Sequence, residues 1–566
     1  MGKLKLLLGA ALAVALCPAP MPAAAQSVAA AQPPGPPAGR GSYDDLLKLW
    51  AEFLAWRDAK PVTGELNSEE VRSNVGDYRP ATIAARRARV AQFLTRAADM
   101  NVASWPRDRQ VDWLAARSKM NQELFILTVS KPWERDPGFY VDQMLEVTFT
   151  ELPAKGPALA TLRNQLRAIP PLVADARRNL KNVPGDFADL ALHNLANADG
   201  VGHGHPYRAT PPAGVIGWYE DLEARARKAQ PALLPEIRAA RTAAAEFQTW
   251  LRAGRPTMTA KAGVGEANFN WYLKNVKLLP YTADQLLVLG DRETKRLWSV
   301  HALEEHRNRK LAKLTLPADK AEYERRRAAT DKRIRSFLAG EEIISIPTDL
   351  GKLYVNVPWI VRPGGPNYWE QVQYRDPSPD WLHATIPGHA FDGEMAKRVT
   401  HPIRGKIDDG VRVEGWGVYL EEGAQRLGLF EDTPRVRELI DIFGIFRAVR
   451  VAGDVKLQLN MAGVPEIVKD WRDWTPWLDE NVARVDAEIY LRRPPGYGLG
   501  YTVGMIEMQK LLADVRHQMG DRFVLKDFHD RLMTIGRLPP SLIRYDMTGR
   551  DDEVRRFWTS DPLPTA

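Results

Sequence analysis

Two histidines stand six positions apart in the stretch 380–394, which reads DWLHATIPGHAFDGE. Imidazole is a common zinc ligand, but six residues of regular helix correspond to a rotation of roughly 240° and a rise of about 9 Å. His383 and His389 can therefore meet at one ion only if the helix is broken between them, and Pro387-Gly388 supplies a break. The alternative is that His383 is a buried core histidine and that Pro387-Gly388 ends a helix.

A third ligand is expected from the next helical segment, 412–428 (RVEGWGVYLEEGAQRLG). Glu414 lies near its start, 25 residues after His389, a distance that suits a turn followed by an antiparallel helix. The sequence thus predicts a zinc ion held by His383, His389 and Glu414. Glu421 lies seven residues further, on nearly the same helical face, and could support a ligand from the second shell or assist catalysis.

The residue directly after the first histidine is Ala384, where a zinc peptidase helix carries the glutamate that activates water. Loss of such a base typically costs about 10²–10⁴-fold in rate. Asp392, Glu394 and Glu421 are the carboxylates that could take its place. The two histidines and the Pro-Gly break therefore indicate descent from a metal-binding motif, whereas Ala384 argues against hydrolysis by the usual glutamate route.

Several segments resemble, in order and spacing, the bacterial family called domain of unknown function 885. They are HATIPGH (383–389), VEGWGVYLEE (413–422), FRAVRVAGDVKLQL (446–459), PPGYGLGYTVG (494–504) and FHDRLMTIGRLP (528–539). The resemblance covers most of the chain and implies a mostly helical, zincin-like fold with metal-dependent peptidase or amide-hydrolase activity. The family signature is similar to His-Glu-x-x-Pro-Gly-His-His followed by Glu-Gly-Trp.

This chain departs from that pattern at five positions. Ala384 replaces the family's glutamate and Ala390 its second consecutive histidine, which puts the identity of the second ligand in doubt. Gln458, Tyr497 and Leu512 stand where the family has histidine, glutamine and arginine. The departures imply that the fold of the family is kept, while its hydrolytic chemistry is relaxed or redirected in this chain.

Three further residues match the resemblance. Tyr501 could donate a hydrogen bond to an oxyanion, or could pack at a glycine-rich helix start. Arg450 and Asp454 are four apart on a predicted helix and would most simply form an ion pair; a substrate-binding role is the alternative.

Other histidines offer weaker sites. His203 and His205 form a His-Gly-His loop without a nearby acid. His401 lies twelve residues past His389 and could fill a vacant ligand position, whereas His529 is expected to be structural.

The elements that must position these groups are mainly helical. Apolar residues recur at helical spacing in 44–60, 79–98, 109–127, 234–251, 282–314 and 433–459. The best strand pattern is 352–361 (KLYVNVPWIV), which predicts a small β element before the two histidines. The predicted fold class is mainly α, a large zincin-like helical body spanning 43–566 as a single domain.

The N-terminus has the pattern of an export signal. Lys3 and Lys5 precede the apolar run 6–16, and residues 23–25 are alanines before Gln26, so 1–25 is predicted to be a signal peptide. The Pro-, Ala- and Gly-rich stretch 26–42 is predicted to be a disordered spacer. No later segment has about 18 uninterrupted apolar residues, so no transmembrane segment is expected. The location would be periplasmic or secreted.

Composition narrows the chemistry. Cys17 is the sole cysteine and falls within the predicted signal, so disulfides and thiolate ligands are excluded from the mature chain. The net charge of +7 is spread among interspersed acids and bases, which argues against nucleic acid as a partner. We expect an exported, divergent zinc hydrolase of peptide or amide bonds. The competing hypothesis is a pseudoenzyme that binds peptides or a protein partner in the ancestral cleft; substrate and oligomeric state stay open.

Overall fold

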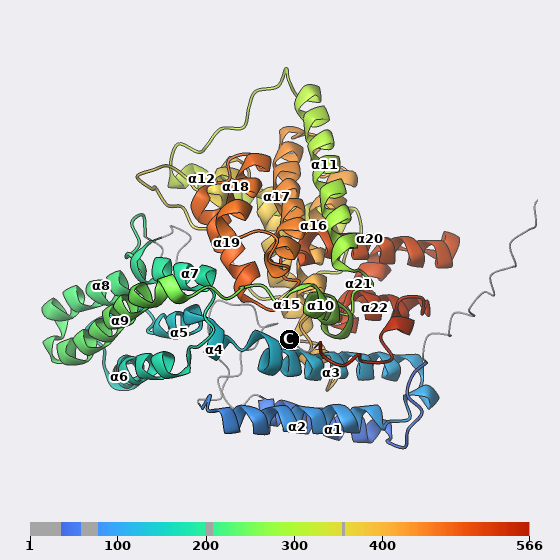
Figure 1. Cartoon of the computed structure of the whole chain (residues 1–566). Helices are drawn as coiled ribbons and strands as arrows, with labels where there is room; N and C mark the ends of the chain where they lie inside the picture. Colours follow the sequence, from blue (N-terminus) through green and yellow to red (C-terminus); the bar gives the residue numbers. More distant parts are fainter. Residues whose placement is uncertain (1–34, 58–76, 199–207, 354–356, 565–566) are drawn as a thin grey trace, which may run out of the picture.

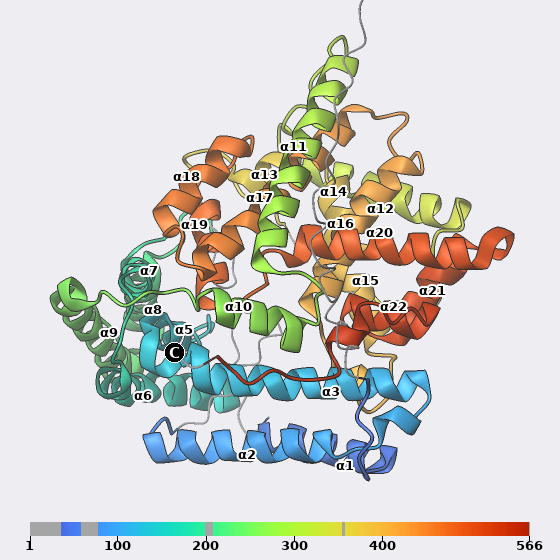
Figure 2. The same cartoon turned by 45° about the vertical axis from the view of Figure 1, so that its right-hand side comes forward.

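The computed structural model describes residues 35–57, 77–198, 208–353 and 357–564, and most of them are helical. The first layer consists of three long helices, α1 (Tyr43–Arg57), α2 (Pro80–Ala98) and α3 (Arg107–Phe125). In both views α1 and α2 lie beneath α3 (Figure 1, Figure 2). The sides of α3 are buried almost all round, because helices cover it above and below.

A second group of helices lies to the left in Figure 1 and has an apolar cluster of its own. Its members are α4 (Pro132–Arg135), α5 (Pro137–Met144), α6 (Gly156–Asn179), α7 (Gly185–Ala196), α8 (Gly214–Ala229) and α9 (Leu234–Gly254). Trp56 and Leu94 pack against both this cluster and the large one that joins the first layer to the C-terminal helices. The prediction that 43–566 is one domain stays a prediction.

The remaining helices form the body that holds the two histidines and the segments named above for their resemblance to a known family. They are α10 (Glu266–Tyr272), α11 (Ala283–Arg307), α12 (Lys320–Gly340), α13 (Tyr368–Arg375), α14 (Ser378–Asp380), α15 (His389–Ala396), α16 (Gly410–Arg426), α17 (Arg435–Gln458), α18 (Val464–Trp474), α19 (Glu480–Arg492), α20 (Gly500–Met519), α21 (Leu525–Ile535) and α22 (Pro540–Thr548). The π-helical turn η7 (Trp381–Thr385) follows α14 directly. The mainly α fold class is therefore confirmed.

The strand expected in 352–361 is not formed by the residues that the structure describes there, 352–353 and 357–361. Aromatic side chains take the place of a partner strand. Tyr374 Oη donates to the Pro358 carbonyl at 2.9 Å and accepts from the Ile360 N–H at 2.9 Å, and Tyr323 Oη donates to the Val357 carbonyl at 3.0 Å. Elsewhere in the described residues, β pairing is limited to isolated bridges such as Asp408–Arg537.

The described end of the predicted spacer, residues 35–42, is held by backbone hydrogen bonds. The N–H groups of Gly39 and Gly41 donate to the carbonyls of Met100 and Asp99 at 3.0 and 2.9 Å. The chain is therefore fixed against the C-terminal end of α2 before α1 begins, which corrects the expectation of free chain up to residue 42. Residues 1–34, which include the predicted signal peptide, lie outside the described part. Within that part, no helix combines the length and apolar character that crossing a membrane requires.

Two helices that carry site residues cross with their backbones in contact. A Cβ added to Gly415 of α16 would lie 2.3 Å from the carbonyl carbon of Gly504 in α20, and one on Gly504 would lie 2.1 Å from the Val411 carbonyl oxygen. Only glycine permits such an approach. The Asp409 side chain accepts from the Arg412 N–H at 3.0 Å and so fixes the start of α16. This crossing sets the position of Glu414 relative to α20.

Candidate metal centre

The two histidines are brought together by a sharp turn at Pro387-Gly388. His383 lies in the π-helical turn η7, and His389 is the first residue of α15. A Cβ at Gly388 would lie 1.9 Å from the His383 carbonyl oxygen, so the turn requires glycine at this position. The imidazole rings end 4.5 Å apart between centroids, at an interplanar angle of 80°.

Glu414 completes a group of three potential ligands. Its Oε2 atom lies 3.1 Å from His389 Nε2 and 3.4 Å from His383 Nε2. One ligand atom from each of the three residues lies within 4.8 Å of the other two. Ligands at the usual zinc distances on a tetrahedral ion are about 3.3 Å apart, and two imidazoles with one carboxylate form a donor set suited to zinc. The residues present therefore fit a zinc ion and would fill three positions of a tetrahedral set.

The backbone of α16 forms one wall of the centre. A Cβ at Gly417 would lie 2.4 Å from His383 Nδ1, so the imidazole packs directly on the helix backbone. The neighbouring Trp416 is fully buried and donates from Nε1 to the Pro387 carbonyl at 2.8 Å. The sequence EGWG thus supplies a potential ligand, a close helix crossing, a hydrogen bond to the turn and the backbone surface on which His383 packs.

A buried ion pair stands behind His383. The Nδ1 atom of His383 lies 2.8 Å from Oε1 of Glu421. The other oxygen of that carboxylate, Oε2, lies 2.5 Å from Nη1 of Arg447 on α17. A carboxylate at Nδ1 favours the proton on that nitrogen and leaves Nε2 free to bind a metal. The Glu421 carboxylate thus faces Nδ1 of His383 and not the Nε2 atom that is turned toward Glu414. Sequence reasoning missed Arg447.

The second oxygen of Glu414 is also held. Tyr497 Oη donates to Glu414 Oε1 at 3.1 Å and lies 3.3 Å from Tyr501 Oη. The Tyr501 ring is nearly parallel to that of His383, with centroids 6.2 Å apart. Burial and the Glu414 charge raise the pKa of both tyrosines, so both hydroxyls stay protonated and can donate. In the sequence, Tyr497 stands out only as a departure from the family pattern.

The charges within the centre are strongly coupled. Burial acts to raise the pKa of Glu414, but the charge of His389 and hydrogen bonds from both histidines hold it well below the ordinary value. Burial and Arg447 act to lower the pKa of His383, whereas Glu414 and Glu421 raise it, and the net pKa is raised. The metal-free centre thus favours an imidazolium–carboxylate pair.

Arg450 and Asp454 are buried but do not pair with each other, contrary to expectation. Arg450 Nη2 lies 2.5 Å from Oδ2 of Asp486 on α19, and its guanidinium carbon lies 4.7 Å from the centroid of the Tyr501 ring. Asp454 accepts from the N–H groups of Gly498 and Leu499 at 2.9 and 3.3 Å. Contacts with α19 and with the loop before α20 replace the i, i+4 ion pair that the spacing predicts. These contacts support Tyr501 and the loop before α20, and a substrate-binding role for Arg450 and Asp454 stays a prediction.

Two carboxylates considered as substitutes for the missing base are engaged elsewhere. Asp392 is buried, with Oδ1 3.1 Å from Arg412 Nη2 and Oδ2 2.8 Å from Arg537 Nε. Glu394 lies 2.5 Å from Lys397 Nζ on the surface of α15. Neither is directed at the histidines.

The other histidines do not join the centre. His401 Nε2 lies 3.2 Å from Tyr43 Oη and 3.5 Å from an oxygen of Asp112, so it belongs to the interface with α1 and α3. His529 is buried between Tyr419 and the Ile343 carbonyl, each at 2.8 Å, in agreement with a structural role. His203 and His205 lie outside the described residues.

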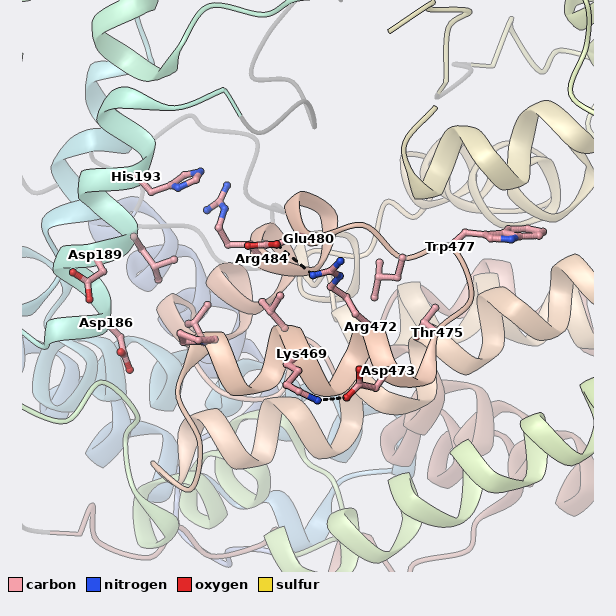
Figure 3. Close-up of a pocket in the computed structure, with 15 residues that line it drawn as sticks. Asp186, Asp189, His193, Lys469, Arg472, Asp473, Thr475, Trp477, Glu480 and Arg484 are labelled. Atoms are coloured by element: carbon pink, nitrogen blue, oxygen red, sulfur yellow. Dashed lines mark hydrogen bonds and ion pairs between the residues drawn. The ribbon is translucent and has the colours of Figure 1, made fainter. Parts of the chain in front are cut away.

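A cavity of about 650 Å³ lies between α7, α18 and α19 (Figure 3). Glu480 and Arg484 line it from α19, whereas Asp486, on the opposite face of that helix, contacts Arg450. None of the three potential metal ligands lines this cavity. Two ion pairs join charged residues of its rim to each other, Lys469–Asp473 and Arg472–Glu480.

Comparison with known proteins places the chain among proteins of unestablished function. A family model described as "Bacterial protein of unknown function (DUF885)" matches residues 63–319 and 373–547. A solved structure described as "a putative lipoprotein of unknown function from Shewanella oneidensis" is 16% identical and covers 90% of this chain and 100% of its own, with a TM-score of 0.63. Another, described as "the putative lipoprotein from Colwellia psychrerythraea", is 14% identical over 90% of this chain and 99% of its own, also at 0.63. These likenesses show a shared fold. No curated protein gives a significant match.

Proposed function

The chain belongs to this bacterial family of unknown function, DUF885, and on that premise we propose that it is a zinc-dependent hydrolase of peptide or amide bonds. The observation that carries the proposal is the convergence of His383, His389 and Glu414 within 4.8 Å. Three protein ligands with one open position are typical of catalytic zinc sites, whereas structural sites have four protein ligands.

The protein groups around the ligands have complementary roles. Bound zinc would polarise a carbonyl oxygen and lower the pKa of water. Glu421 orients His383, and Tyr497 holds one oxygen of Glu414 so that the other faces the histidines. Tyr501 has a protonated hydroxyl beside this group and would donate a hydrogen bond to the oxyanion that forms when the carbonyl is attacked.

Export is part of the proposal. The N-terminal basic residues, apolar run and alanine-rich stretch have the pattern of a signal peptide, and both similar structures are described as lipoproteins. We infer a periplasmic or secreted protein that acts on peptide or amide substrates from its surroundings.

One observation favours a second function. Ala384 stands where the water-activating glutamate of zinc peptidases is expected, so the protein could bind peptides or a protein partner without cleaving them. The two functions share the ligand geometry and differ in turnover.

The first test measures the metal content of the protein. Mature protein purified without chelators should contain about one zinc per chain by inductively coupled plasma mass spectrometry, and Glu414→Ala should lose it. A wild-type protein that cannot be loaded with zinc would overturn the metal centre. For loaded protein, turnover of pooled fluorogenic peptide amides, abolished in Glu414→Ala, supports the hydrolase. Saturable peptide binding without turnover supports the second function.

A further inference from the structure

A second candidate site lies apart from the metal centre, in the cavity of about 650 Å³ between α7, α18 and α19 (Figure 3). Small-molecule sites usually have volumes of about 300–1,000 Å³ and often lie between packed helices. Helix α7 lies where two apolar clusters meet, because Ala191 belongs to the cluster of α4–α9 and Leu190 to the cluster that includes α17, α18 and α19. A ligand in this cavity would therefore contact both helical groups.

One wall of the cavity carries a buried hydroxyl group without a partner. Thr475 directly follows α18, is only 3% exposed, and its Oγ1 atom forms no hydrogen bond within the described residues. Because an unsatisfied buried hydroxyl is costly, the group that occupies the cavity should supply a polar atom to it. Trp477, two residues further along this wall, has φ of +64°, which a bulky residue rarely adopts. Such backbone strain clusters at ligand-binding and active sites.

The opposite end of the cavity carries a carboxylate without a counter-ion. Asp186 of α7 is partly buried and forms no ion pair within the described part of the chain. Figure 3 shows this residue across the cavity from Thr475. The charge of Arg255 reaches Asp186, but that guanidinium is held by Asp189 through two contacts of 2.7 Å. Burial and the charges of Asp189 and Glu466 raise the pKa of Asp186, so a bound cation would be stabilised here.

The other cations and carboxylates that line the cavity have partners of their own. Besides the two rim pairs given above and the Asp189–Arg255 pair, Arg484 Nη1 lies 3.1 Å from an oxygen of Glu488. Much of the remaining lining is apolar and consists of Leu190, Val464, Val468 and Leu478. The cavity thus offers one carboxylate to neutralise, an apolar wall and one hydroxyl to satisfy.

We propose that this cavity binds the amino-terminal end of a short apolar peptide. The ammonium group pairs with Asp186, the first side chain packs on the apolar wall, and a peptide group further along forms a hydrogen bond with the Thr475 hydroxyl. The site needs no metal and does not depend on the hydrolysis proposed above. Since the bound peptide contacts both α7 and α18, binding should also raise the melting temperature of the protein.

The first experiment is isothermal titration of the mature protein in the presence of a metal chelator, so that no zinc-dependent cleavage occurs. The probe is the tripeptide amide Leu-Ala-Leu, with its N-acetylated form for comparison. Acetylation should weaken binding to wild type by about tenfold or more, because it removes the charge that faces Asp186. Asp186→Asn should lose as much affinity for the free-amine peptide and should show no further loss on acetylation. The control Asp291→Asn, at an exposed carboxylate paired with Lys295 on α11, should bind like wild type.

The second experiment tests the other wall with the same peptide. Thr475→Val keeps the shape of the side chain and should weaken binding by about threefold to tenfold. The tryptophan fluorescence change on binding should disappear in Trp477→Phe, since this indole lines the cavity. n-Hexylamine has the ammonium and an apolar chain without peptide groups, and it should bind more weakly by about tenfold or more.

Three results would overturn the proposal. One is the absence of saturable binding of the free-amine peptide to wild type. Another is an equal effect of acetylation in wild type and Asp186→Asn, which would place the ammonium group elsewhere. The third is equal affinity for n-hexylamine and the peptide, which would assign the cavity to small amines. A failure of the zinc centre would leave all of these measurements unaffected.

Discussion

The Nδ1 atom of His383 lies 2.8 Å from Glu421, whose other oxygen is paired with Arg447 inside the protein. We expect Glu421→Gln to lower zinc affinity by about 10–100-fold, because an amide is a weaker acceptor for the imidazole proton than a carboxylate. Competition with a chromophoric chelator measures this. The adjacent Glu422, paired with Arg296 at 2.9 Å, provides the control Glu422→Gln. Equal affinity loss in both variants would argue against an orienting role.

Gly417 gives His383 its place against α16. A methyl group there would lie 2.4 Å from the imidazole, so Gly417→Ala should displace the ring and lower zinc affinity by at least tenfold. Gly423 lies on the same helix with nothing within 4 Å of its added Cβ, and Gly423→Ala should bind zinc like wild type. Alanine there should raise helix stability by up to about 1 kcal/mol. Isothermal titration with zinc compares the two, and unchanged affinity in Gly417→Ala would contradict the close packing.

Tyr497 fixes the orientation of Glu414. Tyr497→Phe removes a hydrogen bond to a buried carboxylate, which is worth about 1.5–3 kcal/mol, and should weaken zinc binding by about tenfold or more. Tyr281 makes a comparable bond to Glu507 at 2.6 Å, away from the centre. Tyr281→Phe should lower the melting temperature without changing zinc affinity. A Tyr497→Phe protein with wild-type affinity would mean that Glu414 is held by the histidines alone.

The buried, neutral His529 is expected to cause part of the loss of folding stability at acid pH. The Ile343 carbonyl accepts from Nδ1–H, so the neutral ring accepts from Tyr419 at Nε2, and burial lowers its pKa from 6.5 to about 4. The unfolded chain takes up this proton below pH 6.5 and the folded chain only below about 4. Stability contributed by neutral His529 is therefore present above pH 6.5 and lost as the pH falls toward 4, by about 3 kcal/mol.

Urea unfolding at pH 7 and pH 4.5 checks this prediction. His529→Gln should show a smaller drop between the two pH values than wild type. The control His517→Gln changes an exposed histidine near the end of α20 and should show the wild-type drop. The same drop in all three proteins would mean that other groups cause the acid loss.

Helical periodicity and a few helix-breaking residues predict much of this structure. Apolar spacing indicated α1, α2, α3, α9, α11 and α17 to within a few residues, except that α11 ends at Arg307 and not near residue 314. The break at Pro387-Gly388 and the 25-residue distance to Glu414 indicated which three side chains converge. These signals are local, so one sequence suffices to read them.

Contacts between distant segments were not predictable in the same way. Arg450 pairs with Asp486, 36 residues away, instead of with Asp454. Arg447 stands beside Glu421 only because α16 and α17 pack together, and no spacing rule indicates it. The strand expected in 352–361 is not formed in the described residues, where Trp359 packs against the rings of Tyr323 and Tyr374.

The glycine-to-glycine crossing of α16 and α20 has a consequence for how this protein can change. The distance between the two helices is set by backbone atoms, so substitutions at positions such as 384, 390 or 497 leave the frame in place. Reactive side chains can thus be exchanged on a scaffold whose dimensions do not depend on them. The same fold can therefore pass from one chemistry to another, or to binding alone, through single substitutions.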